Sequence, residues 1–162
     1  MTVYTAVPTV ATGDMWTAAN HNTYVRDNLA FFKSDFVVHG QVQALGQFDT
    51  TSVTYVDITG ASVSLVLTVP SLVFLTASGI IKADQSAYTA FLQGVIDGTE
   101  AGDGRIRKDG ADGIVWSAFG YTYYKTAVQA GTRVCKLQLM TSNALMTARV
   151  FGINLVALAI AN

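Results

Sequence analysis

From about residue 40 to the C-terminus, the sequence is a succession of short apolar runs separated by turn-forming residues. In the run 62–69, Val and Leu alternate with Ser and Thr over most of its length, and in the run 134–139, Cys135, Leu137 and Leu139 alternate with Val134, Lys136 and Gln138. A period of two places alternate side chains on opposite faces of a strand, so these runs predict half-buried β-strands. This part of the chain is therefore expected to be almost entirely β.

Three other runs, Leu72–Ile81, Tyr88–Ile96 and Arg149–Ile160, are apolar at nearly every position. A strand that is apolar on both faces is normally covered on both. About eight strands follow one another through local connections, which predicts an antiparallel, jelly-roll-like sandwich of two sheets, in an order that the pattern leaves open. A sandwich core covers only one face of each sheet. A partner subunit or a helix is therefore expected to cover the other face of these strands.

The turns are predicted from glycine. Gly40 and Gly46 are expected to mark turns, and the segment Asp97–Gly113 is expected to be a long loop because Asp-Gly occurs in it four times. Carboxylates are the usual ligands of calcium, but the spacing does not match the 12-residue calcium loop and no glutamate closes it. Asp-Gly is also the preferred hairpin dipeptide, so turns are favoured over a metal site. Arg105, Arg107 and Lys108 would form an exposed basic tip able to contact a partner.

One segment has the period of a helix. Thr17 is a suitable N-cap, and Val25, Leu29, Phe32 and Phe36 then lie on one helical stripe. The helix is expected from about residue 18 to 34, and its stripe must pack on the β body or on copies of itself.

The segment before the helix, residues 1–11, is rich in Thr and Val, and Pro8 biases it towards an extended shape. We interpret it as an arm that lies on a neighbouring subunit, with a frayed terminus as the alternative. Residues 1–40 are thus expected to serve attachment and oligomerisation, and residues 41–162 to form the sandwich. The predicted partner-binding residues of the arm and helix are Val3, Tyr4, Val7, Val10, Trp16, Val25, Leu29 and Phe32.

Composition points to assembly. Of the 162 residues, 51% are hydrophobic and 13% are charged, and the net charge is −1. Soluble domains usually contain about 25% charged residues. A Ser/Thr-rich surface explains part of this difference, and burial in an oligomer explains it better. The charge offers no electrostatic attraction to nucleic acid or to an anionic membrane, so neither is expected as a partner.

Residues typical of catalysis or metal binding are not grouped. His21 and His39 have no Cys, His or carboxylate at ligand spacing, and neither a nucleophile elbow nor a phosphate loop occurs. The single cysteine, Cys135, lies in a strand pattern and is expected to be buried. Tyr121, Tyr123 and Tyr124 fit a strand, in which at least one must face outward, or a surface that contacts sugar or protein. We expect no enzyme activity, no cofactor and no metal.

The N-terminal sequence shows neither a basic leader nor a long apolar run, so synthesis and assembly without secretion are expected. The segment Thr12–Leu29, with its Gly-Asp turn, its Thr-Ala-Ala helix start and its Asn-Thr-Tyr-Val-Arg-Asp-Asn-Leu motif, resembles an N-terminal segment of tailed-phage and prophage structural proteins. Asn20-His21 departs from that pattern, which often has an aliphatic pair there. The segment Ala130–Gln138 is similar to a strand start in such modules.

The resemblance implies a virion structural protein, assembled in the host cytoplasm, whose body is often trimeric and jelly-roll-like. The small size favours a homotrimeric capsid decoration (cement) protein that bridges major capsid subunits. Two alternatives remain open: a tail, fibre or receptor-binding head protein, and a binding module like those of TNF or C1q. The missing secretion signal counts against the second.

Overall fold

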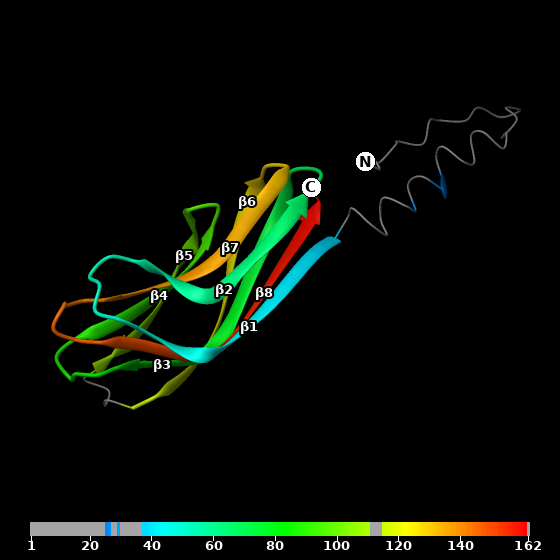
Figure 1. The fold of residues 1–162 in the computed structure, drawn as a ribbon. Helices are drawn as coiled ribbons and strands as arrows, with labels where there is room; N and C mark the ends of the chain where they lie inside the picture. Colours follow the sequence, from blue (N-terminus) through cyan, green and yellow to red (C-terminus); the bar gives the residue numbers. More distant parts are fainter. Residues whose placement is uncertain (1–24, 27–28, 30–36, 111–114, 162) are drawn as a thin grey trace, which may run out of the picture.

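The computed structural model describes residues 25–26, 29, 37–110 and 115–161, except for the side chains of residues 102–104. Residues 37–110 and 115–161 form two four-stranded antiparallel sheets (Figure 1). This confirms a mainly β, antiparallel body. The strands are β1 (Val37–Thr50), β2 (Val56–Leu67), β3 (Ser71–Ala83), β4 (Thr89–Ile96), β5 (Thr99–Asp109), β6 (Ser117–Val128), β7 (Gly131–Thr141) and β8 (Ala148–Ala161).

The first sheet has the order β1-β8-β3-β6, and the second has the order β2-β7-β4-β5. Among these eight strands, only β4 and β5 are consecutive neighbours in one sheet, and every other connection crosses from one sheet to the other. Eight antiparallel strands wound in this way make a jelly-roll-like sandwich.

The strand directions divide the sandwich into two ends. At the entry end, β1 begins at Val37 beside Ile160 of β8, and the β2–β3, β4–β5 and β6–β7 connections lie at this end too (Figure 1). The β1–β2, β3–β4, β5–β6 and β7–β8 connections lie at the opposite end, which we call the far end. Residues 1–36 therefore join the body at the entry end.

The core lies between the sheets and is built by alternation. In β3 and β8, Val73, Leu75, Leu155 and Ala157 are fully buried, while the residues between them face away from the core. Cys135 is fully buried in β7, as predicted. Gly94 lies directly beneath the ring of Tyr123, because a Cβ atom there would lie 2.6 Å from the ring carbon Cδ2. The two sheets are therefore closely packed at this glycine.

The predicted turns at Gly40 and Gly46 are wrong, because both residues lie inside β1, which the sequence reasoning missed. Glycine suits position 40 because a Cβ atom there would lie only 3.1 Å from Cγ1 of Val63 in β2. Gly60 lies within β2 with a positive φ of 82°, at a shift in the register with β7. The sandwich begins at Val37, ahead of the expected boundary at residue 41.

The predicted loop over Asp97–Gly113 is also wrong. Most of it is β5, which pairs with β4. Only Asp97-Gly98 forms the hairpin turn, with positive φ values of 53° and 74° at its two residues, as type I′ turns require. Asp103-Gly104 lies within β5 and Asp109 is its last residue, so neither of these pairs forms the hairpin turn. Asp112-Gly113 lies outside the described residues.

Candidate interaction surfaces

The predicted arm and helix residues fall mostly outside the described residues. This holds for Val3, Tyr4, Val7, Val10, Trp16 and Phe32. Of the predicted helix, the structure describes only Val25, Arg26 and Leu29. Val25 is half-buried, and the side chain of Leu29 is 63% exposed. The role of this segment therefore stays a prediction.

An apolar surface covers the entry end of the first sheet, on the face that points away from the core. In this surface, Leu72 and Val37 flank Ile160, and Tyr124 and Leu158 flank Phe74. Their strand neighbours Val73, Tyr123 and Ala159 are buried in the core, so these residues must face outward. Val37 is 43% exposed and Tyr124 is 56% exposed. We call this surface the entry band; it consists of Val37, Leu72, Phe74, Tyr124, Leu158 and Ile160.

The outer face of the second sheet carries polar side chains that hydrogen-bond to one another across strands. Asp57 of β2 accepts hydrogen bonds from Lys136 Nζ at 2.6 Å and from Gln138 Nε2 at 2.7 Å, both on β7. Gln138 Oε1 in turn accepts from Gln93 Nε2 of β4 at 2.9 Å. The hydrogen bonds from Lys136 and Gln138 hold the pKa of the Asp57 carboxyl below its usual value. This face therefore carries a connected polar network over three strands.

A second polar group lies at the β5 edge of the same face. Arg105 donates from Nε and from a terminal guanidinium nitrogen to the two oxygens of Glu100, at 3.0 Å and 3.1 Å. Its guanidinium also lies 5.5 Å from the ring centroid of Tyr55, which immediately precedes β2. Since β2 and β5 are the opposite edges of this sheet, Tyr55 and Arg105 meet across its outer face.

The predicted basic tip is wrong in two respects. Arg105, Arg107 and Lys108 lie on the paired strand β5 rather than in a loop. Arg105 and Arg107 are exposed, but Lys108 is only 7% exposed. The alternation of the strand gives the reason, because it turns Lys108 and Ile106 to the side opposite the two arginines. Arg107 is paired with Asp109 at 2.8 Å.

The tyrosines of β6 divide between the two faces, as predicted. Tyr123 is 1% exposed, and burial raises the pKa of its hydroxyl. Tyr124 faces outward in the entry band. Burial likewise raises the pKa of the Cys135 thiol to about 11, which removes it from thiolate chemistry near neutral pH.

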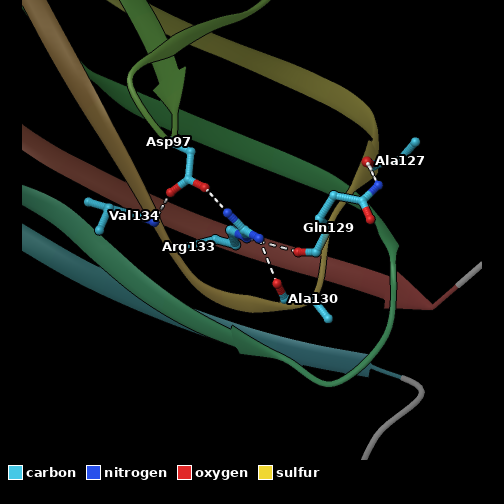
Figure 2. Close-up of polar contacts among 6 residues, drawn as sticks. All are labelled: Asp97, Ala127, Gln129, Ala130, Arg133 and Val134. Carbon is cyan, nitrogen blue, oxygen red and sulfur yellow. Dashed lines mark hydrogen bonds and ion pairs between the residues drawn. The ribbon is translucent and has the colours of Figure 1, made fainter.

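A hydrogen-bonded cluster fastens the turns of the entry end together (Figure 2). Arg133 donates from Nε to the Gln129 carbonyl at 2.8 Å and from a second nitrogen to the Ala130 carbonyl at 2.6 Å. Its third nitrogen pairs with Asp97, whose other oxygen accepts from the Val134 N–H. The Arg133 hydrogen bond lowers the pKa of Asp97. One side chain thus links the β4–β5 turn to the β6–β7 turn.

Within the described ranges, no three His, Cys, Asp or Glu side chains gather at a spacing that could hold a metal ion. In the same part of the chain, no helix has the length and apolar character needed to span a membrane.

No protein-family model and no curated protein matches the sequence. Among solved structures, the CBM36-1 domain of a multidomain xylanase from the hindgut metagenome of Trinervitermes trinervoides is 12% identical, with a TM-score of 0.39 over 72% of this chain and 95% of that chain. The PRD1 vertex protein P5 is 11% identical, with a TM-score of 0.37 over 77% and 97%. The infectious bursal disease virus VP2 subviral particle is 11% identical, with 0.43 over 80% and 38%. All three TM-scores are below 0.5, so these likenesses carry no argument about function.

Sequence reasoning found the doubly apolar runs but not where their outward residues gather. Leu72, Phe74, Leu158 and Ile160 belong to two such runs, and the sequence predicted that both would need a second cover. Only the pairing of β3 with β8 shows that these side chains form one surface beside the start of β1. The polar network of the second sheet gave no sequence signal, because its members lie on three strands.

Proposed function

We propose that this protein is a non-enzymatic structural subunit of a tailed-phage virion. In this proposal it is a homotrimeric capsid decoration protein that bridges major capsid subunits. The observation that carries the proposal is the entry band, an apolar surface at the end where residues 1–36 join the body. An exposed apolar surface of this kind marks a protein contact.

Three further observations support the proposal. The segment Thr12–Leu29 resembles the N-terminal segment of phage structural proteins. The outer face of the second sheet is internally paired, which suits a face turned to solvent. Charged residues are scarce, as expected for a chain that buries much of its surface in an assembly.

The mechanism is stabilisation by mass action. A protein that binds only the assembled shell lowers the free energy of the shell and not that of the dissociated subunits. The arm of residues 1–13 would lie across neighbouring subunits and add strand pairs and apolar contacts. The helix residues Trp16, Val25, Leu29 and Phe32 would anchor the trimer.

Two measurements test the proposal. Light scattering of the full chain should give three times the chain mass, and the protein should sediment with isolated capsids. Deletion of residues 1–16 should abolish the capsid binding without unfolding the sandwich, as judged by circular dichroism. A monomer that does not bind capsids would overturn the proposal.

A second candidate is a tail or receptor-binding head protein. It is favoured by an exposed aromatic pair towards the far end, Trp116 and Phe151, which are 38% and 42% exposed. Binding to host cells or glycans by a protein that does not bind capsids would support this candidate over the decoration protein.

A further inference from the structure

The outer face of the first sheet contains a hollow of about 340 Å³ between the entry band and the far end. It is lined by Ser78, Gly79, Ile80, Phe151 and Gly152. The hollow lies in the middle of the sheet, since β3 and β8 are its two central strands.

Irregular pairing opens the hollow. The β1–β8 register shifts between Ala44 and Gln47, and the β3–β8 register shifts between Ser78 and Ile80, at the same level of β8. Gly152 lies in both shifts, with a positive φ of 62°, and a Cβ atom there would have no neighbour within 4 Å. The surface is therefore missing a row of side chains at this level.

The wall on the far-end side is aromatic. Phe151 projects from β8, and Trp116 precedes β6 on the other side of β3. Their ring centroids are 6.5 Å apart, and their planes are inclined by 59°. Both rings are partly exposed, so they offer apolar area to a ligand.

Uncharged polar side chains lie on the entry-end side of the hollow, where Ser78 belongs to the lining and Asn154 and Gln43 lie beside it. Asn154 pairs with Gln43 on one side and with Ser78 on the other, and all three are exposed. Among the described residues, these three side chains make no hydrogen bond, so their donors and acceptors are available.

In the part of the chain that the structure describes, no ionisable side chain lines the hollow. The charged residues further towards the far end are paired with one another, since Arg149 contacts Asp84 at 2.7 Å and Asp49 at 3.6 Å. A charged ligand would therefore find no counter-charge among the lining residues.

We propose that this hollow binds one unit of a neutral glycan. A sugar ring presents a C–H face that packs on aromatic rings, and its hydroxyls both donate and accept hydrogen bonds. Phe151 and Trp116 would hold the ring face, and Gln43, Ser78 and Asn154 would bind the hydroxyls. An extended peptide fits less well, because the backbone groups of a central strand are already used in the sheet. The inference does not depend on the capsid role.

The test uses the full chain. An array of neutral and acidic oligosaccharides identifies a binder, and isothermal titration calorimetry then measures its affinity. Phe151→Ala should weaken binding about tenfold, because one aromatic contact is removed. Asn154→Ala should weaken binding to a smaller extent. Val66→Ala, which removes an exposed apolar side chain from the outer face of the other sheet, is the control and should leave the affinity unchanged.

A second readout uses tryptophan fluorescence. The chain has two tryptophans, so in the Trp16→Phe protein the emission comes from Trp116 alone, and a bound neutral sugar should shift it. The proposal is overturned if no neutral glycan binds, if acidic glycans bind equally well, or if Phe151→Ala has no effect on affinity. It is also overturned if Phe151→Ala lowers the oligomer mass in light scattering, because the hollow would then be a subunit contact.

Discussion

The two sheets share one core, but their outer faces differ in kind. On the second sheet, Asp57, Gln138 and Gln93 bond to one another across three strands. On the first sheet, Phe74 and Leu158 stand side by side with no core to cover them. Both faces obey the same alternation of strands, so the contrast comes only from which residues fill the outward positions.

Under the proposed function, the first sheet is the face that makes contacts. Exposed ion pairs contribute little to stability, about 0–1 kcal/mol each, and need nothing from a partner. An apolar surface such as the entry band stays costly until another surface covers it. The outer face of the first sheet is thus the one that lacks a cover, and residues 1–36 join this sheet at its edge strand β1.

The largest expected effect comes from charging the entry band. Phe74→Asp combined with Leu158→Asp should reduce the proposed trimer to a monomer, because two carboxylates would have to be buried in the contact. Analytical ultracentrifugation measures the mass. Val66→Asp makes the same kind of change on the outer face of the second sheet, where Val66 is 62% exposed, and should keep the oligomer. If both proteins dissociate, the contrast between the faces is wrong.

The next largest effect is expected in the core between the two sheets. In Gly94→Ala, the new methyl group would meet the ring of Tyr123 at 2.6 Å, and overpacking should lower the free energy of unfolding by about 2 kcal/mol. Urea denaturation measures this change. Gly120→Ala is the control, because a Cβ atom there would have no neighbour within 4 Å. Equal stabilities of the two variants would contradict the close packing of the sheets.

A smaller effect is expected where the turns of the entry end are joined. Arg133→Ala removes three hydrogen-bond donors from Gln129, Ala130 and Asp97. The partners are near the surface and regain water, so the free energy of unfolding should fall by about 1–2 kcal/mol. Thermal unfolding measures the loss, and amide hydrogen exchange should rise in both turns. Faster exchange in only one turn would show that Arg133 does not link them.

The smallest effect concerns the polar face. The pKa of Asp57 is lowered in the folded protein, so its contribution is present above its unfolded pKa of about 3.9 and is lost as the pH falls towards the folded value. Asp57 is 55% exposed, and Asp57→Asn should cost about 0.5 kcal/mol at pH 7. The unfolding free energies of the two proteins should converge as the pH falls below the folded pKa of Asp57. A difference that stays constant with pH would exclude the ionic contribution.

Local pattern in the sequence determined the β class and the buried side of most strands. The alternation in 62–69 and 134–139 reappears in β2 and β7, with Leu65, Leu137 and Leu139 buried. A period of two allows only one face of each run to enter the core, so this much is local. The outward position of Tyr124 and the burial of Cys135 follow from the same rule.

Only the tertiary structure decided the rest. The sequence reasoning missed β1 and β5, because their glycines and Asp-Gly pairs are turn signals when read locally. In the fold, pairing with β8 and β4 keeps both strands extended. Strand order, the gathering of the entry band and the hollow at Gly152 depend on contacts between residues far apart in the chain. Local propensity carries no information about such contacts, because each depends on which strand becomes the neighbour.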